Sequence, residues 1–291
     1  MIWYGTIYFA TSGVLIPIYC IIMLALFRKD RKAPNMTYKL INIINFFDLG
    51  QVLGHFVTSP VFVFPRMQTL FNVEISIIGS IINVCWIGAV PIMALLAVTR
   101  VLIFRGQVES EKMPMTVKLV VFSVSSYMFT MFCISSATQN FLIKPPSWGY
   151  DRSNPFTDIH RTLDQVLQYS SMAISYSAYL VIVAMIFLKK KNTTVKNRKY
   201  ELSILLQYTL ATTYMVTLIV CYYQKGLFDL TSLKTLAGFN TCWILSNAIS
   251  PLSLLIMNKS IREECQRILW KDKNQQPILK VLPTSSCNLY L

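Results

Sequence analysis

Two polar side chains, Asp48 and His55, interrupt an otherwise apolar run, residues 40–64. Seven residues apart, they occupy roughly the same face of a helix. Asp48 lies about 13 Å beyond Lys39 at helical rise, near the middle of a bilayer if the run crosses one. A carboxyl group there costs several kcal/mol unless it is paired, protonated or facing water. We therefore expect a polar partner for Asp48, or a protonated acid bonded to a carbonyl, and interpret His55 as a packed polar residue.

The spacing of reactive residues does not match enzyme chemistry. The chain has no His-Glu-x-x-His, no Gly-x-Ser-x-Gly, no glycine-rich phosphate loop and no Cys/His cluster. Its only histidines, His55 and His160, lie on different segments, and Asp48 has no second intramembrane aspartate with which to form a protease dyad. The sequence predicts no enzyme and no cofactor.

The composition indicates a membrane protein. Hydrophobic residues make up 54% of the 291 residues and charged residues 14%, against roughly 25% charged in soluble domains. The net charge of +14 would suit nucleic-acid binding, but the cations sit in short clusters between apolar runs, as they do in membrane proteins.

Seven apolar runs are each long enough for the roughly 20 residues that a helix needs to cross hydrocarbon. They are too continuously apolar for barrel strands. We predict an all-α membrane protein, a seven-transmembrane helix bundle, from the runs 1–27, 40–64, 75–104, 119–138, 166–188, 202–223 and 235–257.

The orientation follows from the loops. Of the 27 Lys and Arg residues, 21 fall in the segments 28–39, 100–118, 189–199 and 258–291, and six fall on the other side. Cytoplasmic loops carry this excess. We expect a multi-pass plasma-membrane protein with its amino terminus outside and its carboxyl terminus in the cytosol.

The segments between and after the runs complete the domain plan. The longest outer segment, 139–164, is expected to be a loop over the bundle mouth. After the seventh run, Ile261, Cys265, Ile268 and Leu269 share one helical face, which suits a short amphipathic helix in the interface. The plan is therefore a receptor domain at 1–270, including this helix, and a disordered cytosolic tail at 271–291.

Two motifs resemble those of G-protein-coupled receptors. Residues 97–100, Ala-Val-Thr-Arg, stand where such receptors carry an acid-Arg-aromatic triplet, and residues 247–254, Asn-Ala-Ile-Ser-Pro-Leu-Ser-Leu, resemble their Asn-Pro-x-x-Tyr. More specifically, the chain resembles the nematode serpentine chemoreceptors, closest to class T (Srt). The cues for this class are residues 38–40 leading to 47–49, residues 95–100 and residues 256–262.

The resemblance implies a receptor for a small molecule or peptide that signals to a heterotrimeric G protein. Arg100 would contact the G protein, although an anchoring charge at the interface is the simpler interpretation. Asp48 would face Asn247 and Ser250 through water or a sodium ion. Pro251 is expected to kink the seventh helix, because its ring removes a backbone hydrogen bond.

The candidates for ligand binding lie in the outer halves of the bundle, where aromatic rings offer contact area with a polar handle. Each of these aromatic residues could equally be an ordinary belt or core residue. Glu74 would suit a cationic ligand or simply cap its helix. The candidates are Glu74, Trp86, Tyr169, Tyr176, Tyr214, Tyr222, Asn240 and Trp243.

The chain also departs from the receptor pattern. The disulfide between the third span and the second outer loop has neither cysteine, the sixth span has no Trp-x-Pro, and Thr99 replaces the acid before Arg100. A seven-span transporter or a ligand-gated channel is the alternative function. A transporter built from duplicated halves would show an internal repeat, and we find none.

Overall fold

The computed structural model describes residues 2–151, 153–188, 195–224 and 232–270, with the side chains of 186–208 outside the description. The predicted tail at 271–291 therefore lies outside the described residues, and so do all side chains of the basic segment 189–199.

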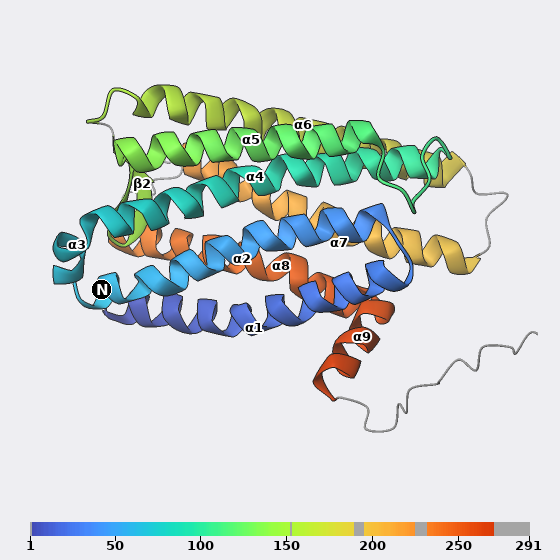
Figure 1. The fold of residues 1–291 in the computed structure, drawn as a ribbon, viewed down its shortest axis with the longest axis horizontal. Coiled ribbons are helices and arrows are strands. Elements are labelled where there is room, and N and C mark those ends of the chain that lie inside the picture. The colour runs from blue at the N-terminus through green and yellow to red at the C-terminus, as the bar shows by residue number, and fades with distance from the viewer. Residues whose placement is uncertain (1, 152, 189–194, 225–231, 271–291) are drawn as a thin grey trace, which may run out of the picture.

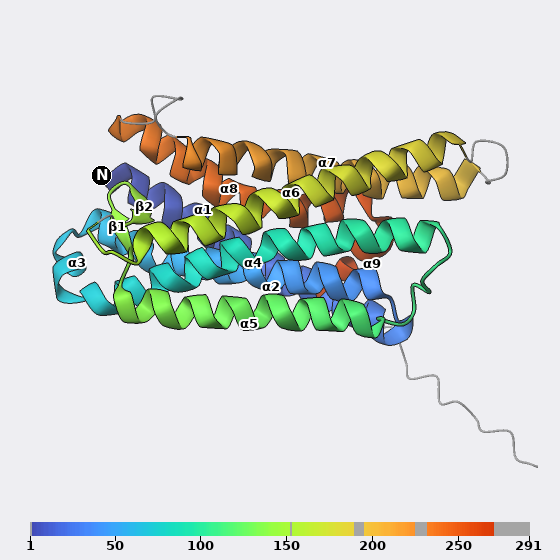
Figure 2. The same cartoon turned by 90° about the horizontal axis from the view of Figure 1, so that it is seen from above.

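The described residues form seven long helices, and these lie side by side in one bundle (Figures 1 and 2). Six of them are long and apolar enough to cross a membrane, and within the described residues the seventh, α7, contributes the shorter apolar segment Thr209–Tyr223. The predicted all-α seven-transmembrane bundle is confirmed. The long helices are α1 (Ile2–Lys32), α2 (Met36–Val63), α4 (Asn72–Phe104), α5 (Met115–Thr138), α6 (Thr157–Leu188), α7 (Val195–Tyr223) and α8 (Leu233–Met257).

Shorter elements distinguish the two ends of the bundle (Figure 1). At one end, called here the hairpin end, lie the amino terminus, α3 (Arg66–Leu70) and the strands β1 (Phe141–Lys144) and β2 (Ser147–Tyr150). Toward the other end, the α9 end, α9 (Lys259–Leu269) turns away from the bundle.

The segment predicted to be a loop over the bundle mouth is largely ordered. Its first part is an antiparallel hairpin in which Phe141 pairs with Tyr150 and Lys144 with Ser147. Its last part is the beginning of α6, which starts at residue 157 rather than at the predicted 166. Hydropathy missed this stretch because His160 and Asp164 are polar, yet both side chains are buried.

The hairpin rests directly on α4 because α4 has a glycine at the contact. A Cβ atom added at Gly79 would lie 2.4 Å from Trp148 Cζ3 and 3.0 Å from the Phe141 carbonyl oxygen. Trp148 is only 1% exposed, and its ring stacks on that of Phe141. Small residues allow such close approach of main chains inside a bundle.

The helix after the seventh span forms over the predicted residues. Asn258 caps α9 by accepting from the Ile261 backbone N–H at 3.2 Å. Along the predicted apolar face, Ile261 and Cys265 are buried, Ile268 is half-buried and Leu269 is exposed.

An ion pair joins α9 to α1. Glu264 is buried and accepts a hydrogen bond from Lys32 Nζ at 3.2 Å, while Arg267 lies 3.4 Å away. Burial by itself would raise the pKa of Glu264, but the Lys32 hydrogen bond and the nearby cations outweigh it, so the pKa lies below its ordinary value. The carboxylate is therefore charged when it holds α9 in place.

Candidate functional site

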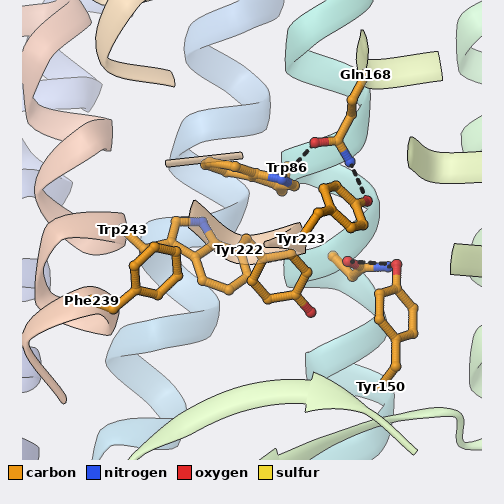
Figure 3. A pocket seen from close by; sticks show the side chains of 8 residues that line it. Trp86, Tyr150, Gln168, Tyr222, Tyr223, Phe239 and Trp243 are labelled. Atoms are coloured by element: carbon orange, nitrogen blue, oxygen red, sulfur yellow. Dashed lines mark hydrogen bonds between the residues drawn. The ribbon is translucent and has the colours of Figure 1, made fainter. Parts of the chain in front are cut away.

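An aromatic cleft lies inside the bundle just below the hairpin (Figure 3). Helices α4, α6, α7 and α8 and strand β2 all contribute to it. It is lined by Asn83, Trp86, Tyr150, Gln168, Tyr222, Tyr223, Phe239 and Trp243.

The rings of the aromatic cleft contact one another. Trp243 lies edge-on to Trp86 at 5.0 Å between ring centroids and to Tyr222 at 5.9 Å. Tyr222 in turn stacks on Phe239 at 6.3 Å. Such offset and edge-to-face pairs are the favoured arrangements of aromatic rings, so the cleft presents a continuous apolar surface.

Hydrogen bonds hold the polar edges of these rings. Trp86 Nε1 donates to Gln168 Oε1 at 3.2 Å, and Gln168 Nε2 donates to the Tyr223 hydroxyl at 3.1 Å (Figure 3). The enclosed volume is about 10 Å³, close to the space that one water molecule needs. The cleft is closed in this structure, and a ligand larger than water would have to move a ring.

A larger cavity of about 340 Å³, called here the vestibule, lies beside the hairpin. This volume is within the range of small-molecule sites. Tyr150 and Tyr222 line both the vestibule and the aromatic cleft, so these two rings separate the cavities. The other lining residues of the vestibule are Lys144, Ser147, Trp148, Gly149, Asp151, Arg161 and Leu236.

The structure brings three of the predicted ligand residues together, namely Trp86, Tyr222 and Trp243. The others do not line the aromatic cleft. Glu74 is exposed in the first turn of α4. Tyr176 contacts Thr213 Oγ1 at 3.1 Å, Tyr214 donates to the Cys242 carbonyl at 3.0 Å, Tyr169 packs on Tyr223 at 5.9 Å, and Asn240 is fully buried in α8.

Sequence reasoning missed five residues of the aromatic cleft. Two of them carried a usable signal: Asn83 and Gln168 are polar residues inside apolar runs, the same signal that singled out Asp48. Tyr223 and Phe239 resembled many other aromatic residues. Tyr150 could not be found from the sequence, because only the hairpin brings it under the bundle mouth.

A buried hydrogen-bond network, called here the hairpin network, joins the hairpin to α4, α5 and α6. The Tyr150 hydroxyl donates to Asp164 Oδ2 and accepts from Asn83 Nδ2 at 3.1 Å, and the Tyr127 hydroxyl donates to Asp164 Oδ1 at 3.3 Å. Burial, reinforced by the Asp164 charge, raises the pKa of Tyr150 well above its ordinary value. Tyr150 therefore stays protonated and donates.

His160 extends the hairpin network toward the end of α5. Asn140 Nδ2 lies 2.9 Å from His160 Nδ1 and can only donate to it, so a neutral ring carries its proton on Nε2. That nitrogen lies 3.3 Å from Asp164 Oδ2. Ser135 donates to Asn140 Oδ1 at 2.8 Å. The hairpin network thus attaches the hairpin to the bundle without a disulfide among the described residues.

A second buried polar contact joins α1, α2 and α8. The Tyr19 hydroxyl donates to the Asn247 carbonyl oxygen and lies 3.2 Å from Asp48 Oδ2. The Asn247 carbonyl needs this donor, because Pro251 four residues later has no N–H to offer it. Asp48 therefore meets span seven through Tyr19, and the predicted contact with Asn247 and Ser250 through water or a sodium ion stays a prediction.

One family matches nearly the whole chain. Residues 1–277 match the serpentine-type seven-transmembrane G-protein-coupled chemoreceptors of class Srt. The chain belongs to this family. No curated protein matches it.

In this Srt chemoreceptor, Arg100 lies on α4 one turn before the helix ends. Its Nε is buried, with no hydrogen-bond partner among the described residues. Thr99, which stands in place of the acid, donates to the Leu96 carbonyl at 2.9 Å. The predicted contact of Arg100 with a G protein stays a prediction.

The predicted sodium ion at Asp48 stays a prediction. Among the described residues, no group of three or more His, Cys, Asp or Glu side chains could hold a metal ion. Ser250 is half-buried, and its carbonyl accepts from Ser253 at 3.0 Å. Neither observation identifies further oxygen ligands around Asp48.

Replacing Tyr19 with phenylalanine tests the Asp48 contact. Tyr19→Phe leaves the Asn247 carbonyl without a donor, so we expect the free energy of unfolding to fall by about 1–3 kcal/mol. Tyr214→Phe is the matched control, because its acceptor, the Cys242 carbonyl, has an ordinary helical partner as well. Thermal unfolding of the purified Srt chemoreceptor measures both. An equal effect of the two substitutions would contradict the role given to Tyr19.

Proposed function

We propose that this Srt chemoreceptor binds a small extracellular ligand in the aromatic cleft and signals to a heterotrimeric G protein at the α9 end. The observation that carries the proposal is the aromatic cleft itself. It lies at one end of the bundle, next to an open vestibule, in a chain of a chemoreceptor family.

The distribution of cations supports the orientation. Of the 27 Lys and Arg residues, 21 fall in the sequence segments predicted to be cytosolic and six fall in the others. Of the cation-rich segments, 28–39, 100–118 and α9 are described, and they lie toward the α9 end. Cytoplasmic segments carry such an excess. The hairpin, the vestibule and the amino terminus then face the outside of the plasma membrane, and α9 faces the cytosol.

A set of contacts connects the aromatic cleft to the middle of the bundle. Trp243 Nε1 donates to Gln51 Oε1 at 3.3 Å, one turn of α2 from Asp48. Trp243 also precedes Asn247 by one turn of α8. A ligand that displaces Trp243 would therefore act on the same two helices that Tyr19 holds together.

The mechanism is a shift between two populations. The aromatic cleft is closed around about 10 Å³, so a ligand binds better to a conformation in which its rings have moved. A ligand stabilises whichever conformation it binds better. We propose that this conformation opens the α9 end and exposes Arg100 to an acidic surface of the G protein. The basic segment 189–199, of which 189–194 lie outside the described residues, would add electrostatic attraction.

Replacing Arg100 with alanine tests the signalling end. In cells that report G-protein activation, we expect Arg100→Ala to lower the ligand response at least tenfold while surface expression is retained, because the partner loses its central cation. Arg105→Ala is the matched control, since Arg105 follows the end of the same helix and is exposed.

Two results would count against this proposal. An unchanged response in Arg100→Ala would remove Arg100 from the mechanism. Solute flux that depends on the protein and on no G protein would favour the alternative function, a transporter or a channel.

A further inference from the structure

Arg161 is a cation without a matching carboxylate in the described part of the chain. It is half-buried and lines the vestibule. Its guanidinium lies over the Tyr223 ring, 5.7 Å from the centroid, and its Nη2 lies 3.5 Å from the Tyr223 carbonyl oxygen. Among the described residues, no carboxylate oxygen lies within 4.0 Å of it. Five donors in a planar fork are therefore largely unused.

The nearest acids on the same helix do not neutralise the charge of Arg161. Asp164, three residues further along α6, is buried and accepts from Tyr150 and Tyr127. Asp158, three residues before it, is exposed and forms no ion pair among the described residues.

Among the described residues, Asp151 is the carboxylate that lines the vestibule, and it has a cation of its own. Asp151 lies 4.0 Å from Lys144 Nζ. Hydrogen bonds from Ser153 and the charge of Lys144 hold the pKa of Asp151 below its ordinary value, so it is ionised at neutral pH. Lys144 and Asp151 offset each other, and the charge of Arg161 leaves the vestibule positive.

We propose that the vestibule binds small organic acids, with the ligand carboxylate on Arg161 and its apolar part against Tyr222. Arginine is suited to this role because its fork matches a carboxylate with two parallel hydrogen bonds. The apolar part would enter the aromatic cleft when the Tyr222 ring moves, since that ring lines both cavities. Glu74 is exposed and does not line the vestibule, so a cationic ligand finds no acid there comparable to Arg161. The inference names the ligand class of the proposed function and rests on it.

Three probes that differ only in their polar group test the inference: 3-phenylpropionate, 3-phenylpropionamide and 3-phenylpropylamine. Each is titrated against the purified full-length receptor, and the midpoint of thermal unfolding is followed. We expect the acid to raise the midpoint at concentrations where the amide and the amine do not. Arg161→Gln should bind the acid about 10- to 150-fold more weakly than the unchanged receptor does. This factor corresponds to the loss of one charge-assisted hydrogen bond, which contributes about 1.5–3 kcal/mol.

Arg66→Gln is the matched control, because Arg66 is an exposed arginine at the same end of the bundle and does not line the vestibule. If Arg161→Gln does not accumulate, Arg161→Lys makes the same comparison, because it keeps the charge and loses the fork. Equal stabilisation by acid and amide, or acid binding unchanged in the tested Arg161 variant, would overturn the proposal.

A parallel G-protein assay with the same probes separates this inference from the proposed function. Stabilisation by the acid without G-protein activation would retain the acid site and remove the signalling function. Activation by the amide or the amine, with no effect of the acid, would retain signalling and remove the acid site.

Discussion

Gly79→Ala is expected to lower the free energy of unfolding by about 1–3 kcal/mol, the usual cost of overpacking, and to abolish ligand responses. The sign of this change in the free energy of unfolding is informative, because alanine in place of a helical glycine normally stabilises a protein by about 0.5–1 kcal/mol. Here the added Cβ would meet Trp148 Cζ3 at 2.4 Å and the Phe141 carbonyl at 3.0 Å. A main-chain oxygen cannot move away alone, so the hairpin must shift and take Tyr150 with it. Thermal unfolding and a ligand-response assay measure the two effects.

Two other glycines provide controls for this substitution. A Cβ at Gly238 would meet nothing within 4 Å, so Gly238→Ala should be neutral or stabilising. A Cβ at Gly88 would meet only the Met128 side chain, whose flexible end can move, so Gly88→Ala should be milder than Gly79→Ala. Trp148→Leu removes the closest obstacle, and combined with Gly79→Ala it should cost less than the sum of the single effects. Additive effects, or a stabilising Gly79→Ala, would show that the hairpin does not rest on α4 as described.

Asp164→Ala should destabilise the receptor by about 2–6 kcal/mol, because it leaves two buried hydroxyl donors without an acceptor and each such donor costs about 1–3 kcal/mol. The substitution takes the acceptor from the Tyr150 and Tyr127 hydroxyls, and it removes the carboxylate that faces His160 Nε2. Asp164 and His160 are almost completely buried, so water cannot replace the lost acceptor without opening the site. We expect a lower midpoint of thermal unfolding and reduced surface expression.

Asp158→Ala is the matched control on the same helix, because Asp158 is exposed and forms no ion pair among the described residues. It should cost less than about 1 kcal/mol, the value of an acid near a helix amino terminus. Adding Tyr150→Phe to Asp164→Ala removes one of the stranded donors and should recover part of the loss. If Asp164→Ala and Asp158→Ala lower the free energy of unfolding equally, the hairpin network contributes little to stability.

The hairpin network also explains how the hairpin is held without the disulfide that the receptor pattern implies. Tyr150 takes part in the hairpin network and lines both the aromatic cleft and the vestibule. The same contacts that attach the hairpin therefore shape the proposed ligand site.

The bundle could be predicted because hydropathy is a local property of the chain. Each long helix contains its predicted apolar run or nearly all of it, and the helix after span seven begins at the capping residue Asn258. The boundary of α6 was wrong by nine residues, because its first turns carry polar side chains that the hairpin buries. A hydropathy profile assigns such residues to a loop, because it depends on residue type and takes no account of the partners that bury a polar side chain.

The candidate site was predictable only in part, for the same reason. Asp48 was recognised because a carboxyl in an apolar run needs a partner, but the partner, Tyr19, looked like any other tyrosine of the first span. Trp86, Tyr222 and Trp243 were among the candidates, but their types alone did not separate them from Tyr176 and Tyr214. Only contact between α4, α7 and α8 makes that distinction.

The sequence by itself determined that this is a membrane protein and which segments cross the bilayer, because both follow from the order of apolar and charged residues along one chain. Its motifs also resembled those of the family to which it belongs. The tertiary structure decided which polar groups meet. Tyr150 reaches Asp164, Tyr19 reaches Asn247, and Arg161 is left without a carboxylate among the described residues. In a medium without water every buried donor must find an acceptor within the protein, and that pairing is a property of the folded arrangement rather than of any one segment.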